Sequence, residues 1–144
     1  FFEVASAYNV IIGLASAGTA ISKSTDSFGA AADNVGFRLG GADITNSIFL
    51  ESDDGTTDND DKDSGVDFTS GTYAVYKIDM TDLSNVLFFV DGVLVNNGNT
   101  FDMSQIAASD LLEPYIVFAR VGSSGTEKAH TMDIDYIHCT WKRS

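Results

Sequence analysis

The sequence predicts an all-β fold, an antiparallel β-sandwich or jelly roll of about nine to eleven short strands. Short runs rich in β-branched and aromatic residues recur along the 144 residues, and Gly, Asn and Asp turns separate them. Ten Phe, five Tyr and one Trp occur beside thirteen Gly and one Pro, a composition that fits a compact β domain. A chain of this length suits one domain, which we expect to span residues 1–144.

The amino-terminal part contains five of the predicted strands. Val35, Phe37 and Leu39 alternate with polar or small residues, so they share one face of a strand. Residues 15–32 are small and polar without helical spacing of apolar positions, which indicates a long loop. The strands expected in this part are 2–6, 10–14, 34–39, 44–50 and 66–68.

Residues 51–63 are strongly acidic. Seven carboxylates and one Lys lie within thirteen positions. Because unpaired charges are rarely buried, we expect this acidic segment to be an exposed loop or the tip of a long hairpin.

The centre of the chain, residues 72–95, reads as an antiparallel meander. Tyr76, Ile78 and Met80 fall on one face of its first strand. Residues 86–90 are apolar throughout, which is typical of a strand covered on both faces. Asp91-Gly92 follows, and this dipeptide is the strongest short-range hairpin signal, because a type I′ turn needs positive φ at both central residues.

The carboxyl-terminal third continues the strand pattern. Residues 96–99 predict a turn, and residues 102–112 predict a short helical turn that Pro114 ends. Residues 115–121 and 129–141 predict two further strands, the last with Met132, Ile134 and Tyr136 on one face.

The charge balance limits the partners of the chain. Eight basic against twenty-one acidic residues give a net charge of −13, so we expect neither nucleic acid nor an anionic membrane as a partner. No apolar run reaches the length of a membrane span, and no basic signal-peptide start is present. The chain begins inside a strand pattern and not at a Met, as a processed or trimmed chain would.

Known catalytic patterns are incomplete in this sequence. Asp133 and Asp135 share a strand face and resemble part of the Glu-x-Asp-x-x-Glu signature of laminarinase-type glucanases, but both flanking Glu are missing. His130 and His138 are eight positions apart, roughly 26 Å along a strand, so they cannot bind one metal. No nucleophile elbow or phosphate-binding loop occurs. We therefore predict no catalytic residue, no cofactor-binding residue and no enzyme activity, with an unusual glycosidase as the least favoured reading.

Metal binding stays an alternative at the acidic segment. Asp58 and Asp60 alternate as in a Ca²⁺ loop, but Lys62 and the missing Gly break the pattern. We predict a solvated loop and no metal ligand, with Ca²⁺ as the alternative. Cys139, the only cysteine, is expected to be a small buried residue, against a reactive thiol or an intermolecular bridge. Most aromatic residues are expected in the core, although four could stack on sugar rings: Tyr8, Tyr73, Tyr115 and Trp141.

Several stretches resemble one family of jelly rolls. Residues 88–95, Phe-Phe-Val-Asp-Gly-Val-Leu-Val, resemble the F-x-V-D-G-x-x-V hairpin of concanavalin-like and laminin-G-like domains. Residues 73–79 resemble the strand before that hairpin, and residues 132–138 resemble the closing strand with its two Asp and a Tyr. Similar strands of those domains match residues 11–14 and 35–38. The resemblance implies a concanavalin-like jelly roll over most of the chain.

This combination is similar to small virion proteins of tailed bacteriophages that decorate capsids or form fibre and tail parts. The resemblance implies a non-enzymatic virion protein, a capsid decoration or cement protein that acts as a homo-oligomer on the major capsid protein or other virion proteins. The alternative is a glycan-binding, lectin-like module of a tail fibre or receptor-binding protein. The acidic segment and residues 15–32 match no family motif, and we expect them to be available to a partner.

Overall fold

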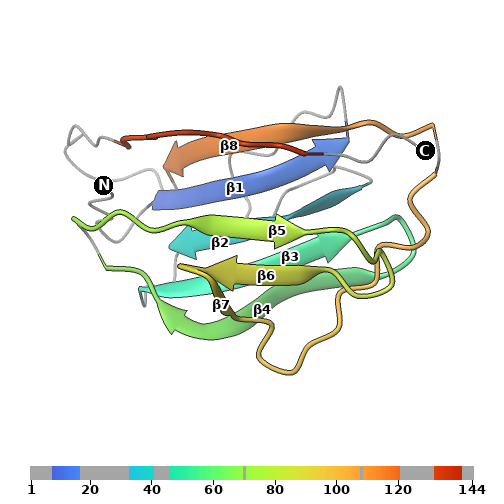
Figure 1. Ribbon diagram of the computed structural model, residues 1–144, viewed down its shortest axis with the longest axis horizontal. Helices are drawn as coiled ribbons and strands as arrows, with labels where there is room; N and C mark the ends of the chain where they lie inside the picture. Colours follow the sequence, from blue (N-terminus) through green and yellow to red (C-terminus); the bar gives the residue numbers. More distant parts are fainter. Residues whose placement is uncertain are drawn as a thin grey trace.

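The computed structural model describes residues 8–16, 33–40, 46–69, 71–107, 109–120 and 132–140, which form eight strands and no helix (Figure 1). Every strand pair among them is antiparallel. The all-β prediction is therefore confirmed for these residues, with eight strands where nine to eleven were predicted; the predicted strand 2–6 lies outside them. The strands are β1 (Tyr8–Ser16), β2 (Asn34–Gly40), β3 (Ser47–Asp53), β4 (Asp58–Asp67), β5 (Tyr76–Asp79), β6 (Leu87–Val90), β7 (Val93–Leu94) and β8 (Leu112–Arg120).

The larger sheet has five strands in the order β4-β3-β2-β1-β8. Its register places Phe37 of β2 opposite Ile12 of β1 and Leu50 of β3. Because side chains alternate along a strand, Val35, Phe37 and Leu39 all enter the core, and each is fully buried. The predicted strands at 10–14, 34–39 and 44–50 are thus confirmed in their described residues, which exclude 44 and 45.

The smaller sheet has the order β5-β6-β7 and contains the predicted hairpin. Asp91 and Gly92 have φ angles of 50° and 80°, the positive values that a type I′ turn requires. The Asp91 carboxylate accepts the Val75 N–H at 2.8 Å, and the Asp91 N–H donates to the Val75 carbonyl at 2.9 Å. These two bonds fasten the turn to the chain that enters β5.

Aromatic side chains join the two sheets in a sandwich, and Figure 1 shows β5 and β6 lying in front of the larger sheet. Phe37 of β2 meets Phe88 of β6 edge to face, with ring centroids 5.2 Å apart and planes at 88°. Phe101 packs on Phe88 at 4.8 Å, and Tyr76 packs on Phe37 at 5.2 Å. Edge-to-face contacts suit the charge distribution of aromatic rings, so this stack forms the centre of the core.

The acidic segment 51–63 forms a hairpin, as one of the two alternatives predicted, and its acids Asp58, Asp60, Asp61 and Asp63 are exposed as expected. The expected exposure is wrong for two of its acids, Glu51 and Asp54. β3 continues to Asp53 and β4 begins at Asp58, so only four residues form the turn. Glu51 and Asp54 are 1% and 4% exposed. Both acids can be buried because the protein supplies hydrogen-bond donors to their carboxyl groups: the Arg38 guanidinium to Glu51, and backbone N–H groups to Asp54.

Three further expectations differ from the structure. The predicted helical turn within 102–112 is absent from its described residues, where only short turns occur. Pro114 lies inside β8, which is the edge of the larger sheet, where a missing N–H removes no ladder bond. Met132 makes a single bridge, and residues 133–140 are exposed and belong to neither sheet. The predicted last strand therefore fails in these residues, because a strand needs a partner to pair with.

Candidate functional site

Beyond Met132, the described residues from the predicted closing strand lie on the surface. Asp133, Asp135 and His138 are exposed on the segment 133–140, and His130 lies outside the described residues. Cys139 is also exposed and unpaired by any disulfide, so the expectation of a buried cysteine is wrong. The reason is that this segment stays outside the core after Met132.

Carboxylates from neighbouring strand ends gather at one end of the larger sheet. Asp33 precedes β2, Asp53 ends β3, Asp54 follows it, and Asp110 precedes β8. The register explains the gathering, because Asn34 pairs with Asp53 and Ser16 pairs with Leu112. We call Asp33, Asp53, Asp54 and Asp110 the acidic end.

Asp33 and Asp110 form a carboxyl–carboxyl contact at the acidic end. Asp33 is 5% exposed, and its backbone carbonyl accepts the Ser16 N–H at 2.8 Å. Burial raises the pKa of Asp33, and the hydrogen bond and negative charge of Asp110 raise it further. The charges of Asp53 and Asp54 act in the same direction. Asp33 therefore holds its proton more tightly than a free carboxyl group does.

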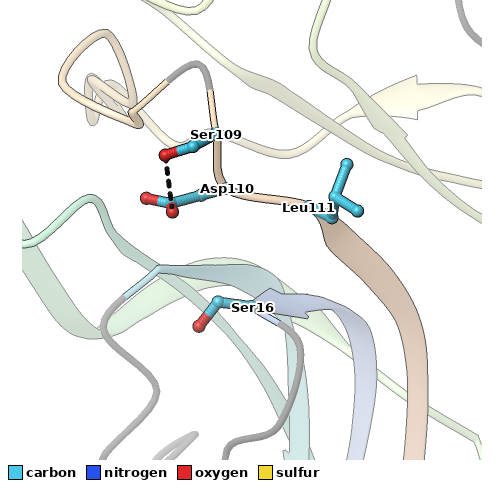
Figure 2. Close-up of a pocket in the computed structure, with 4 residues that line it drawn as sticks. All are labelled: Ser16, Ser109, Asp110 and Leu111. Atoms are coloured by element: carbon cyan, nitrogen blue, oxygen red, sulfur yellow. Dashed lines mark hydrogen bonds between the residues drawn. The ribbon is translucent and has the colours of Figure 1, made fainter.

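A small open pocket lies beside this pair (Figure 2). It has a volume of about 200 Å³ and is lined by Ser16, Ser109, Asp110 and Leu111. Ser109 Oγ donates to Asp110 Oδ1 at 3.4 Å, and Figure 2 shows Ser16 across from them while the Leu111 side chain points away. Pockets for drug-sized ligands are larger, roughly 300–1,000 Å³, and mostly apolar. The pocket geometry therefore does not favour an organic substrate.

Asp54 uses its carboxylate to connect two loops. Oδ1 accepts the Thr56 and Thr57 N–H groups at 3.1 and 2.7 Å, and Oδ2 accepts the Gln105 N–H at 2.9 Å. Burial raises the pKa of Asp54, but the N–H bonds from Thr57, Gln105 and Thr56 together outweigh it and leave the pKa lowered. The β3–β4 turn is thereby tied to the loop that precedes β8.

The predicted Ca²⁺ alternative finds no ligand set in the structure that is described. In that part of the chain, no three His, Cys, Asp or Glu side chains come together in a group that could hold a metal ion. Several carboxylates of the acidic segment instead accept bonds from the protein itself: Asp53 from the Gly55 N–H, Asp63 from the Gly65 N–H, and Asp61 from Arg38.

A buried ionic cluster crosses three strands on the outer face of the larger sheet. Arg38 of β2 reaches over β3, where its guanidinium lies 4.4 Å from the centre of the Phe49 ring. Its Nε donates to Glu51 Oε1 and to Asp61 Oδ1, each at 2.9 Å, and Nη2 also donates to Asp61. Nη1 donates to the Gly40 carbonyl at 2.8 Å. The Arg38 and Glu51 side chains are 5% and 2% exposed, and that of Asp61 is 50% exposed. We call Arg38, Glu51 and Asp61 the ionic cluster.

A β-bulge aims Asp61 into the ionic cluster. The register of β3 and β4 shifts between Leu50↔Lys62 and Ser52↔Asn59, so two residues of β4 stand opposite Glu51. Asp61 has a φ of 52° there, a left-handed conformation that non-Gly residues seldom adopt. The hydrogen bonds from Arg38 hold Asp61 in this conformation, and they reach from β2 over β3 to β4.

Glu51 is the titrating member of the ionic cluster near neutral pH. Burial raises the pKa of Glu51 to about 8; the Arg38 charge opposes the rise, and the Asp61 charge and hydrogen bond add to it. Glu51 is therefore mostly protonated at pH 7 and hydrogen-bonded to Asp61. The single guanidinium then faces one carboxylate charge instead of two.

Large apolar side chains are exposed at several places. Val93 and Leu94 of β7 are 63% and 52% exposed, and Tyr73 before β5 is 68% exposed. On the last described segment, Ile134, Tyr136 and Ile137 are 50–64% exposed. Scattered apolar residues are normal on a surface, but these three lie within four positions of one exposed segment. We call Ile134, Tyr136 and Ile137 the carboxyl-terminal patch.

Sequence reasoning missed both carboxyl contacts. The signal for the ionic cluster is visible in β2, since Arg38 lies between Phe37 and Leu39 and must face away from the core. A lone Arg inside an apolar strand, followed by acids on the next two strands, indicates a paired charge. The Asp33–Asp110 contact has no local signal, because the two residues are far apart in sequence.

Comparison with protein-family models, with curated proteins and with solved structures finds no match. Within the part of the chain that the structure describes, no helix has the length and apolar character to cross a membrane.

Proposed function

We propose that this chain is a non-enzymatic virion protein of a tailed bacteriophage, a capsid decoration or cement protein that acts through contacts between several copies and the shell. The proposal includes a concanavalin-like jelly-roll topology and a location in the virion. The carboxyl-terminal patch carries the proposal, because three apolar side chains exposed together on a chain of net charge −13 need a partner surface to cover them.

Two further observations support this role. The hairpin at residues 88–95, which resembles a jelly-roll motif, adopts the type I′ turn with positive φ at Asp91 and Gly92. The small open pocket at the acidic end is a poor substrate site, and the exposed Asp133 and Asp135 lie on no sheet. Contact surfaces are therefore better supported than catalysis.

The native mass of the isolated chain tests the proposal. Light scattering should give a trimer or larger assembly whose mass does not change when EDTA is added. Ile134→Ser combined with Ile137→Ser should lower that mass, because it removes apolar area from the carboxyl-terminal patch. Leu111→Ser is the matched control, since Leu111 is 73% exposed but lies elsewhere, and it should leave the mass unchanged. A monomer at all concentrations would count against oligomeric decoration.

A glycan-binding module is the second candidate, because Tyr73 and Tyr136 are 68% and 64% exposed. Exposed tyrosines supply the flat apolar rings on which sugars stack. A glycan array with and without chelator separates the two roles. Binding that Tyr136→Ser abolishes favours the lectin-like module, and a monomer that loses thermal stability in EDTA points the same way. An array without any bound glycan, beside a stable oligomer, favours the virion role.

A further inference from the structure

The ionic cluster fastens an edge strand to the larger sheet. β4 is the last strand of that sheet, and its ladder with β3 shifts register twice, between Ser47 and Phe49 and between Leu50 and Ser52. The second shift contains Asp61 in its left-handed conformation. β4 is thus held by an interrupted ladder, by the side-chain bonds from Arg38 to Asp61, and by side-chain bonds that join it to Ser47, Ser52 and Asn97. An edge strand with these interruptions is the part of the sheet that separates most easily.

The charge inside the cluster depends on one proton. Among the described residues, the charged groups that face Glu51 are Arg38 from β2 and Asp61 from β4, with the exposed Asp60 beside Asp61. With Glu51 neutral, one positive and one negative charge balance. With Glu51 ionised, two carboxylates share one guanidinium in a site where Glu51 has almost no contact with water.

We propose that Arg38, Glu51 and Asp61 form a pH-operated latch, in which protonated Glu51 holds β4 closed against β3 and the loss of its proton opens β4. This inference is independent of the proposed virion role. Ionised Glu51 needs water, and β4 offers the shortest route because the Asp61 side chain is already half exposed. β2 lies between β1 and β3 inside the sheet, so it cannot move without breaking two complete ladders.

The direction of the pH effect follows from proton linkage. Closed Glu51 keeps its proton up to a pKa of about 8, whereas a solvated Glu has the ordinary value of 4.5. Opening therefore releases one proton at any pH between these values. The equilibrium constant for opening rises about tenfold per pH unit in that window and becomes constant above pH 8.

Hydrogen exchange of backbone amides measures this opening. Between pH 5.5 and 7.5, the opening constant of the β4 amides, corrected for the intrinsic exchange rate, should rise roughly a hundredfold. The β1 amides, which lie inside the sheet, should remain better protected than those of β4 at each pH. Glu51→Gln should remove the pH dependence, because the amide stays neutral and still donates a hydrogen bond. Glu113→Gln, on the exposed face of β8, is the matched control and should respond as the wild type does.

Three results would overturn the latch. One is a β4 opening constant that stays level between pH 5.5 and 7.5. Another is equal opening of β4 and β1 at every pH, which would make the event global unfolding. The third is a carbon-13 titration of the Glu51 carboxyl group with a midpoint near 4.5. This titration uses the wild-type protein, so it does not require any variant to fold. A midpoint near 8 with local β4 opening supports the latch.

Discussion

At the scale of single residues, the charged Arg38 side chain can be buried because groups on three strands accept its hydrogen bonds or pack against it. Glu51, Asp61 and the Gly40 carbonyl accept its bonds, and the Phe49 ring lies against its guanidinium. Each partner alone would leave part of the charge without compensation. The whole set makes burial of Arg38 tolerable, since a buried charge is stable only when it is paired and hydrogen-bonded.

Replacing Arg38 with Met should destabilise the protein by about 3–5 kcal/mol, because buried Glu51 and strained Asp61 then lose their common donor. Urea denaturation of the two proteins at pH 7 measures this difference. Arg38→Lys should recover only part of it, since an ammonium group cannot supply the planar set of donors. A cost below about 1 kcal/mol for Arg38→Met would mean that the cluster contributes little to stability.

The pKa of Asp54 is shifted in the opposite direction from that of Glu51. Its pKa is lowered, so its contribution to stability is present above the ordinary value of 3.8 and is lost as the pH falls below it. Glu51 has a raised pKa, so its contribution is complete below 4.5 and is lost as the pH rises to about 8. Of two acids on the same hairpin, Asp54 therefore stabilises the folded protein at neutral and high pH, and Glu51 stabilises it at low pH.

Asp54→Asn should cost about 1–3 kcal/mol at pH 6, because the amide keeps a single acceptor oxygen and cannot replace both Oδ1, which accepts the Thr56 and Thr57 N–H groups, and Oδ2, which accepts the Gln105 N–H. The difference between wild type and variant should shrink as the pH is lowered from 4 to 2, measured by thermal denaturation across that range. Asp58→Asn, exposed on the same hairpin, should change stability by less than about 0.5 kcal/mol. If the stability difference between wild type and Asp54→Asn grows as the pH falls, the lowered pKa of Asp54 is contradicted.

At the scale of elements, local sequence decides the β6–β7 hairpin. The φ of Gly92 is 80°, and no atom lies within 4 Å of the place where a Cβ would stand. Replacing Gly92 with a larger residue therefore strains the backbone but causes no steric clash. Gly98 has a φ of 78° and equally open surroundings, so it offers the same situation in a second turn.

Gly92→Ala should cost about 1–2 kcal/mol through left-handed strain alone. Gly98→Ala is the matched variant and should cost a similar amount, which urea denaturation can compare directly. Chemical shifts should place any change in Gly92→Ala at residues near the turn. No loss of stability in either variant would show that these turns relax to another conformation without strain.

The acidic hairpin of β3 and β4 is decided by contacts from outside the hairpin. Its charges predict solvent exposure, yet two of its acids are buried, because Arg38 from β2 donates a hydrogen bond to Glu51 and the Gln105 N–H donates one to Asp54. Sequence reasoning treats each acid by its average behaviour. The partners that change this behaviour are 13 and 51 positions away in the chain.

At the scale of the whole molecule, the two sheets are held together by the aromatic stack. Phe88 is fully buried between Phe37 and Phe101, whereas its neighbour Phe89 points to the other face and contacts Lys77. The two residues thus have the same side chain on opposite faces of one strand. They provide a direct comparison of core and surface positions.

Phe88→Ala should cost about 3–5 kcal/mol, since it leaves a cavity at the contact between the sheets. Phe89→Ala should cost about 1–2 kcal/mol, because its ring is only partly removed from water. Denaturation midpoints of both variants under one set of conditions test the contrast. Equal costs would mean that the interface between the sheets does not depend on this stack.

Local sequence predicts β1, β2, β3, β5, β6, β7 and β8, the face of β2 that enters the core and the Asp-Gly turn, whereas most of β4 falls in the segment expected to be a loop or hairpin tip. These features depend on side-chain alternation and on φ preferences, which act between near neighbours in the chain. Three features follow from long-range contacts: Glu51 and Asp54 are buried, Asp33 meets Asp110, and residues 133–140 lie outside both sheets. The reason is that the burial of a charge and the pairing of an edge depend on which distant groups arrive beside them. The local pattern indicates that Arg38 needs an acidic partner on the outer face of β2, but it does not identify which distant acids lie there.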